Sequence, residues 1–158
     1  MRGNTDGTWA LKIGPTSFNR VAREMIVTKR AYEPAAAADG YRVLIDRLWP
    51  RGVSKAKARL AAWEKDIAPS RELREWYGHD PAKWPEFRRR YTRELRAPAA
   101  EAILNALVRR AQRGRVTLVY ASKAADISDV VVLEQLLKRR SRAQQRRRAR
   151  DGEASRRP

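Results

Sequence analysis

Short apolar runs alternate with longer amphipathic stretches along most of this chain, and the two patterns predict strands and helices respectively. Apolar runs at 25–32, 42–48 and 115–121 predict three strands. The second and third are separated by helical sequence, so we expect them to be parallel, with right-handed crossovers. Only eight residues connect the first strand to the second, which is short for a helical crossover. That strand can therefore pair in either direction.

Apolar residues at helical spacing predict helices in five places. Ser54 can cap the first, in which Leu60, Trp63 and Ile67 recur at i, i+3 and i+7. Ser70 caps a second, short helix that Gly78 ends. The remaining three helices are expected from Asp80-Pro81 to Leu95, from Pro98 to Gly114, and from an Asp126 or Ser128 cap to Leu137.

Pro85 is the awkward residue in this pattern, because its missing N–H falls just inside the third helix. Either the first turn of that helix is distorted, or the regular helix begins near Trp84. Five aromatic residues of the helical region recur at helical spacing and are expected in the core. They are Trp63, Trp76, Trp84, Phe87 and Tyr91.

The order of these elements predicts an α/β fold: a single-domain sandwich with a small, mostly parallel sheet flanked by helices. The 158 residues suffice for one such domain, expected at 25–137. Residues 1–24 show neither apolar period, so we expect a disordered N-terminal extension. The apolar pattern ends after Leu137, and residues 138–158 are expected to form a basic, disordered C-terminal tail.

Charge is the main compositional feature. The formal net charge is +18, and residues 138–158 hold ten basic and two acidic side chains, a net +8. Arginine-rich segments bind phosphate backbones without sequence preference. A nucleic-acid or acidic-partner accessory protein is therefore one functional hypothesis. The chain has no evident helix-turn-helix motif, so sequence-specific regulation is disfavoured.

The composition also excludes several classes of site. The chain has no cysteine and one histidine, which excludes disulfides, thiolate chemistry and multi-histidine metal centres. A carboxylate Mg²⁺ site is not excluded on this basis. No nucleotide-phosphate loop motif is present, and we predict neither a metal nor a cofactor. No apolar run approaches 18 residues and no signal-peptide pattern is seen, so we expect a cytoplasmic protein without membrane contact.

The ends of two predicted strands carry the candidate chemistry, because ligands of open α/β sheets bind beyond the carboxyl ends of the strands. One loop is Asp46–Gly52 and the other is Ser122–Asp129. Basic side chains from both loops could face a small anion near a helix N-terminus, and Asp46 could orient an arginine or act as an acid or base. The candidate ligand-binding residues are Arg47, Trp49, Arg51, Ser122 and Lys123.

Each of these residues also has a structural interpretation. Asp46 can instead pair with an arginine, and Trp49 can close the edge of the sheet, in place of a binding role. His79 is a second catalytic candidate beside Asp46, but its position next to the Asp80 cap favours a role in helix entry. Ser122 has no second histidine or nucleophile-elbow motif to support a hydrolase triad.

Three segments resemble the YeaO-like branch of the domain-of-unknown-function 488 family. They read "DGYRVLIDRLWPRGVSK", "APSRELREWYGHDPAKWPEFRRRYTREL" and "RGRVTLVYASK", and the resemblance runs from Ile26 to about Leu137. It implies a small bacterial cytoplasmic protein with an α/β fold and no assigned activity. It also supports Pro50 and the other "DRLWPRG" residues, with His79, as site candidates.

The second loop departs from the pattern of that resemblance. The family pattern places two acidic residues, a histidine and an asparagine where this chain has Ala124, Ala125, Ile127 and Ser128. Three functional hypotheses follow. The leading one is an α/β protein that binds, and could turn over, a small anion between the two loops. The others are the nucleic-acid or acidic-partner accessory protein and a degenerate scaffold without a ligand.

Overall fold

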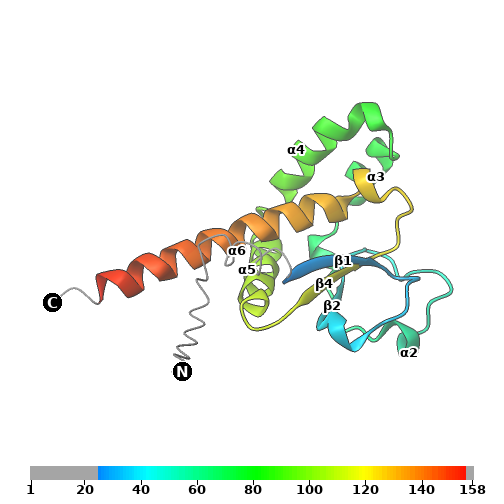
Figure 1. Cartoon of the computed structure of the whole chain (residues 1–158). Helices are drawn as coiled ribbons and strands as arrows, with labels where there is room; N and C mark the ends of the chain where they lie inside the picture. Colours follow the sequence, from blue (N-terminus) through cyan, green and yellow to red (C-terminus); the bar gives the residue numbers. More distant parts are fainter. Residues whose placement is uncertain (1–24, 156–158) are drawn as a thin grey trace, which may run out of the picture.

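The computed structural model describes residues 25–155, which form a parallel sheet covered mainly on one face by helices (Figure 1). Four strands are present in this range, in the spatial order β1-β4-β2-β3, and every neighbouring pair is parallel. The strands are β1 (Ile26–Arg30), β2 (Tyr41–Leu44), β3 (Ala62–Trp63) and β4 (Val116–Tyr120). The predicted α/β class is confirmed. The first strand, whose direction the sequence left open, is parallel to β4.

The helices are α2 (Lys55–Ala58), α3 (Arg71–Tyr77), α4 (Trp84–Glu94), α5 (Pro98–Ala111) and α6 (Asp129–Ala154), with 3-10 turns at Ala37–Asp39, Lys65–Ile67, Pro81–Lys83 and Ala125–Ile127. The short helix after Ser70 is confirmed, because the Ser70 hydroxyl accepts the Leu73 N–H and Gly78 takes the left-handed conformation. Both alternatives for Pro85 hold in part: a 3-10 turn comes first, and the regular helix begins at Trp84.

Alternating residues of the central strands point to two cores of unequal size. Val43, Ile45 and Leu118 face the main core, which α3 to α6 cover. Leu44 and Val119 face the other side, where they meet a smaller cluster formed by the segment around Trp49 and Trp63. All five residues of β4 are buried, as expected for a central parallel strand.

The helix predicted from Ser54 through Ile67 is wrong after its first turn. Ser54 does cap α2, but Arg59 adopts a left-handed conformation and the chain then forms β3. The helical spacing of Leu60, Trp63 and Ile67 was coincidental, because the first two pack in the smaller cluster and Ile67 packs in the main core.

The tail is the second correction. Helix α6 continues through residues 138–154, where the sequence predicted disorder, and projects beyond the sheet (Figure 1). Ser141 is buried, and Arg140 donates two hydrogen bonds to Glu101 of α5, at 2.8 and 2.9 Å. These contacts anchor the helix past Leu137, and the arginine, glutamine and alanine residues that follow favour helix. The expected N-terminal extension, 1–24, lies outside the described residues.

Candidate functional site

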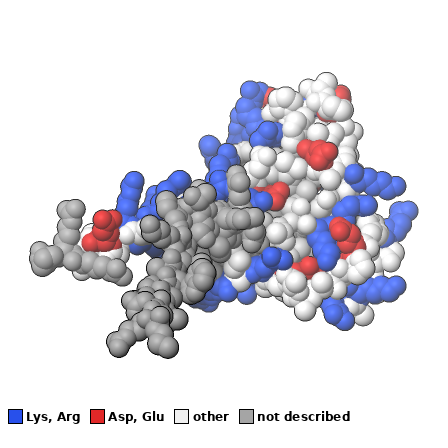
Figure 2. Space-filling view, in the orientation of Figure 1, with Lys and Arg blue, Asp and Glu red and all other residues white. Residues whose placement is uncertain are grey.

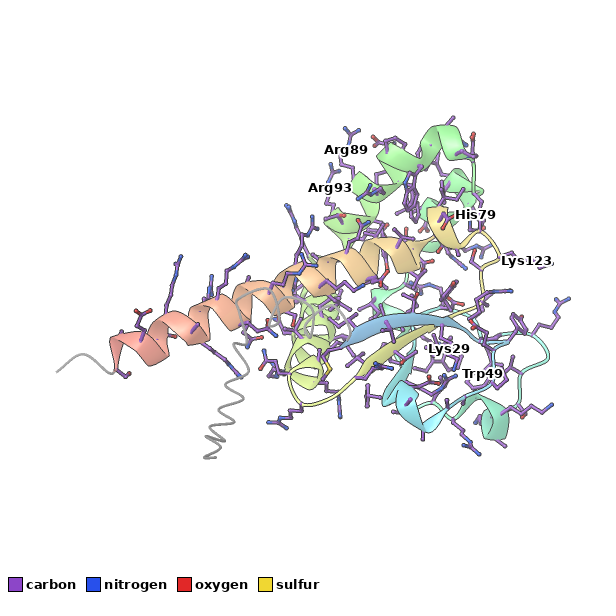
Figure 3. All side chains as sticks on the ribbon, viewed as in Figure 1. Lys29, Trp49, His79, Arg89, Arg93 and Lys123 are labelled. Atoms are coloured by element: carbon purple, nitrogen blue, oxygen red, sulfur yellow. The ribbon has the colours of Figure 1, made fainter. Side chains whose placement is uncertain are left out.

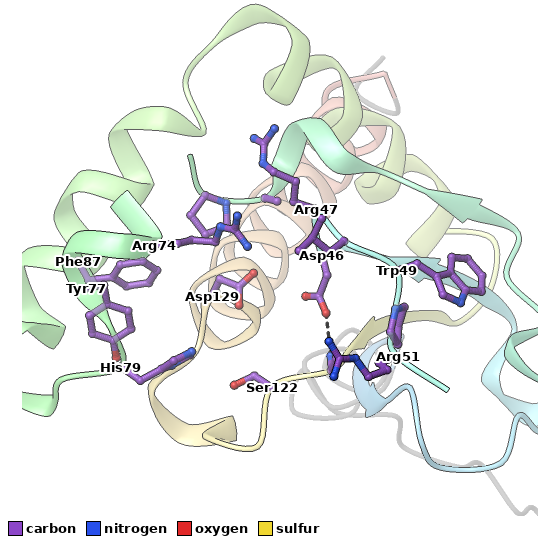
Figure 4. A pocket seen from close by; sticks show the side chains of 15 residues that line it. Asp46, Arg47, Trp49, Arg51, Arg74, Tyr77, His79, Phe87, Ser122 and Asp129 are labelled. Atoms are coloured by element: carbon purple, nitrogen blue, oxygen red, sulfur yellow. Dashed lines mark hydrogen bonds between the residues drawn. The ribbon is translucent and has the colours of Figure 1, made fainter. Parts of the chain in front are cut away.

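A cavity of about 310 Å³ lies where β2 and β4 end, beneath α3 and the start of α6 (Figure 4). Its wall is mostly apolar, and its polar side chains come from four separate segments. The lining residues are Asp46, Arg47, Leu48, Trp49, Pro50, Arg51, Ala68, Pro69, Arg74, Tyr77, His79, Phe87, Ala121, Ser122 and Asp129. The cavity therefore occupies the strand-end position at which the sequence placed a site.

Most of the candidate residues line this one cavity. Asp46, Arg47, Trp49, Arg51, His79 and Ser122 do so, whereas Lys123 does not. The Lys123 side chain is exposed and extends outward from the second loop (Figure 3). The expectation that Lys123 meets Arg51 at the ligand is thus wrong, because the loop turns its lysine to solvent.

Asp46 connects the two strand ends. Its Oδ2 accepts a hydrogen bond of 2.8 Å from the Ala121 N–H, just past β4, and its backbone oxygen accepts the Trp63 indole N–H at 2.6 Å. Burial raises the pKa of the Asp46 carboxyl, while the Ala121 hydrogen bond and the positive charge of Arg74 act to lower it. Within residues 25–155, Asp46 forms no direct ion pair with an arginine, contrary to the structural interpretation offered above.

Asp129 is the second acid in the cavity and the first residue of α6. Burial and the negative charge of Asp46 raise its pKa to about 7, against the opposing influence of its own N–H, the Val130 N–H and Arg74. The predicted cap, Ser128, occupies the cap position, but its hydroxyl donates to the Ala125 oxygen at 3.1 Å instead. Asp129 is therefore an acid that changes charge near neutral pH.

Arg74 of α3 faces the two carboxyl groups across the cavity (Figure 4). Its positive charge lowers the pKa of both Asp46 and Asp129. Its Nε is buried and has no hydrogen-bond partner within residues 25–155. A buried N–H donor without an acceptor is costly, so the described protein does not fully satisfy the Arg74 side chain.

Sequence reasoning missed both Arg74 and Asp129. Arg74 lies beside the apolar stripe formed by Leu73 and Tyr77, so the sequence pattern predicts a surface position for it. Asp129 is the last residue of the loop that the strand-end rule selected. Only its position at the start of a helix indicates a functional role. Applying that rule to the helix that follows each strand would have found Asp129; nothing in the local pattern marks Arg74.

Aromatic side chains form one wall of the cavity. Tyr77 stacks on Phe87 with 4.1 Å between ring centroids, and its hydroxyl donates to the Ile127 oxygen at 2.6 Å. That bond ties α3 to the second loop. His79 lies at the rim, exposed and with a left-handed φ of 55°, a conformation uncommon for residues other than glycine.

Trp49 lines the cavity but is held by the protein. Its indole N–H donates to the Val53 oxygen at 2.6 Å, and its ring meets Trp63 edge to face at 5.4 Å. Arg47 and Arg51 are exposed at the cavity mouth. Trp49 thus serves the smaller core, and the two arginines leave their charges at the opening.

Residues 25–155 lack two features that would indicate a class of protein. No three His, Asp or Glu side chains in this range gather as a metal site requires. No helix in the same range combines the length and apolarity needed to cross a bilayer.

Comparison with known proteins gives a family and relatives of undescribed activity. The profile of DUF488-N3i, described as "Inactive DUF488-N3 subclade", matches residues 25–157. The uncharacterized protein Rv3073c of Mycobacterium tuberculosis is 47% identical over 108 residues, which is 68% of this chain and 89% of that protein. The uncharacterized protein YeaO of Escherichia coli is 38% identical over 113 residues, 72% of this chain and 96% of YeaO. No solved structure gives a significant match.

Proposed function

This chain belongs to the DUF488-N3i family, the inactive DUF488-N3 subclade, and we propose that it binds a small anionic molecule in the strand-end cavity without transforming it. The observation that carries the proposal is the buried Arg74 Nε without a hydrogen-bond acceptor. An anion with a carboxylate or sulfate-like oxygen would supply that acceptor.

The charge balance of the cavity supports an anion. Arg47, Arg51 and Arg74 line it, and the two acids that oppose them are Asp46 and Asp129. The three arginines outnumber the two acids even when both are ionised, and because the pKa of Asp129 is about 7, partial protonation of this acid near physiological pH increases the positive excess. In its neutral form Asp129 is also a hydrogen-bond donor to an anionic oxygen.

The wall of the cavity favours an anion that carries an apolar group. Leu48, Pro69 and Tyr77 present carbon surface beside the arginines. Ligand sites commonly combine such surface with a few converging polar groups. A small aromatic or branched carboxylate fits that description better than a bare ion does.

Two features support binding without turnover. The family profile that matches the chain is described as inactive. The second loop carries Ala124, Ala125 and Ile127 at positions where the resemblance implies two acids and a histidine, so this loop lacks three ionisable side chains that the resemblance implies. The cytoplasmic location expected from the sequence remains a prediction.

Isothermal titration of the full chain with benzoate, and with benzamide as its neutral counterpart, tests this proposal. We expect benzoate to bind and benzamide to bind at least about tenfold more weakly, because only the anion pairs a negative charge with the Arg74 guanidinium, whereas benzamide offers a neutral acceptor. R74M should lose benzoate binding by a similar factor. R71Q is the matched control, since Arg71 lies one turn away on α3, is exposed and pairs with Glu75.

Two results would contradict the proposal. One is that R74M and the native protein bind benzoate equally, while circular dichroism shows that both proteins are folded. The other is that benzoate, sulfate and phosphate all fail to stabilise the native protein against unfolding. Conversion of bound benzoate, followed by proton NMR over hours, would refute the claim that no reaction occurs.

A further inference from the structure

A concentration of positive charge lies away from this cavity, between α4 and α6. A surface groove of about 550 Å³ runs between the two helices there. Its charged lining residues are all arginines: Arg88, Arg89, Arg93, Arg96 and Arg139. We call it the arginine groove. Figure 3 shows Arg89 and Arg93 on the edge of α4 that looks over α6, and Figure 2 shows basic side chains gathered along both helices.

The acids nearest in sequence do not neutralise the whole groove. Glu94 of α4 is turned to Ser70, whose N–H and hydroxyl it accepts at 2.8 and 2.6 Å. Glu86 pairs with Arg89 and with Arg90, which lies outside the groove. No acid within residues 25–155 pairs with Arg93, Arg96 or Arg139. Like charges held this close repel one another, so the groove is complementary to a polyanion.

Helix α6 extends this positive surface beyond the groove. Arg139, Arg142, Arg146 and Arg150 follow at i, i+3, i+7 and i+11 and therefore lie along one face. At 1.5 Å per residue the stripe is about 16 Å long. The Arg142 Nε is buried and has no hydrogen-bond partner within residues 25–155. The stripe thus places arginines at regular spacing along α6, and the described protein does not fully satisfy one of them, Arg142.

We propose that the arginine groove and the α6 stripe bind the phosphate backbone of a double-stranded nucleic acid. Arginine suits phosphate because its planar guanidinium can donate two parallel hydrogen bonds. Duplex DNA carries one charge per about 1.7 Å of axis, so a stripe of this length lies against several phosphates.

A duplex fits this surface better than a single strand does. Single-strand binding relies on exposed aromatic rings on which bases stack. Within residues 25–155 the only large apolar side chains that are exposed are Tyr32 and Leu48, and neither lines the groove. The aromatic ring nearest the groove arginines, Trp84, is half-buried beneath Arg88, whose guanidinium lies 5.6 Å from the ring centroid.

This inference is independent of the proposed function, because the two surfaces share no lining residue. An acidic protein is the competing occupant. Carboxylates on a folded protein do not repeat at the spacing of a phosphate backbone, whereas the α6 arginines recur at every turn of the helix. The regular stripe therefore favours the nucleic acid.

Fluorescence anisotropy of a labelled duplex of about 20 base pairs and arbitrary sequence, titrated with the full chain over about 50 to 300 mM salt, tests the proposal. The groove variant is R93Q/R96Q/R139Q. Its control is R71Q/R109Q/R113Q, which removes the same charge from exposed positions outside the groove. We expect the groove variant to weaken binding at least about tenfold at 100 mM salt and to reduce the slope of log K against log salt by about 2 to 3. The control should weaken binding by less than about threefold, and R74M should leave it unchanged.

Three outcomes would overturn the proposal. If both triple variants lose the same affinity, only net charge attracts the duplex. If the native protein fails to bind at the lowest salt, the groove has no affinity for the backbone. If poly-glutamate displaces the duplex at equal charge concentration, the groove recognises acidic polymers in general, and an acidic protein becomes the preferred partner.

Discussion

Replacing Asp129 with asparagine should remove a pH dependence of stability that this single carboxyl creates. Its pKa is about 7 in the folded protein, against 3.8 for an unperturbed group. Between these values the native state holds a proton that the unfolded chain has released. Stability therefore falls as the pH rises toward 7, the reverse of the behaviour of a salt-bridged carboxylate. From about pH 5 to about pH 8 the loss is about 3 kcal/mol, at roughly 1.4 kcal/mol per pKa unit.

Asparagine keeps the size of the side chain but cannot ionise, so D129N should lack this loss. Urea unfolding of both proteins at the two pH values measures it. The free energy of unfolding of D129N, relative to the native protein, should rise by about 3 kcal/mol from the lower to the higher pH. D126N is the control, because Asp126 is exposed in the same loop. The reasoning would be refuted if the free energies of unfolding of D129N and the native protein differed by the same amount at both pH values.

Two further predictions concern the fold. Gly40 has φ 65°, and a Cβ there would meet the Arg115 carbonyl oxygen at 2.3 Å, so G40A should lose about 3 kcal/mol or more in urea unfolding. A Cβ at Gly152 of α6 would meet nothing within 4 Å, so the free energy of unfolding of G152A should stay within about 1 kcal/mol of the native value. Equal losses in G40A and G152A would contradict this account. A chain that ends at Leu137 loses buried Ser141 and the Arg140–Glu101 bonds, so thermal unfolding should show a loss of about 2 kcal/mol. A chain that ends at Gln145 should lose little, and equal melting of both truncated chains would show that α6 is not anchored past Leu137.

Three of the four strands, β1, β2 and β4, could be predicted from sequence because each contains an apolar run. The fully buried β4 reads as a continuous apolar run, and its neighbours repeat the signal more weakly. The segment from Ser54 to Ile67 could not be predicted, because it contributes residues to two different cores. Leu60 and Trp63 pack on one side of the sheet and Ile67 on the other, and their sequence spacing alone cannot show this.

The tail was mispredicted for a different reason. Its arginines give no apolar stripe, so the absence of a core pattern after Leu137 suggested disorder. In this segment, helix propensity and two tertiary contacts, at Arg140 and Ser141, stabilise the helix instead. Residues 138–151 contain neither Gly nor Pro and follow an established helix, so continuing that helix needs no new nucleus and costs little.

The candidate site shows how far a topological rule reaches. The strand-end rule brought Asp46 and Ser122 to one cavity from opposite halves of the chain. It could not supply Arg74, because the approach of α3 depends on how the main core packs. Yet Arg74 and Asp129 determine what the cavity can hold. With both acids ionised, the carboxylates would repel an anion and could satisfy the arginine themselves. Protonation of Asp129 removes one negative charge, so the cavity is most receptive to an anion below about pH 7. Under the proposed function, Asp129 would serve to admit an anion rather than to catalyse a reaction, in keeping with a family described as inactive.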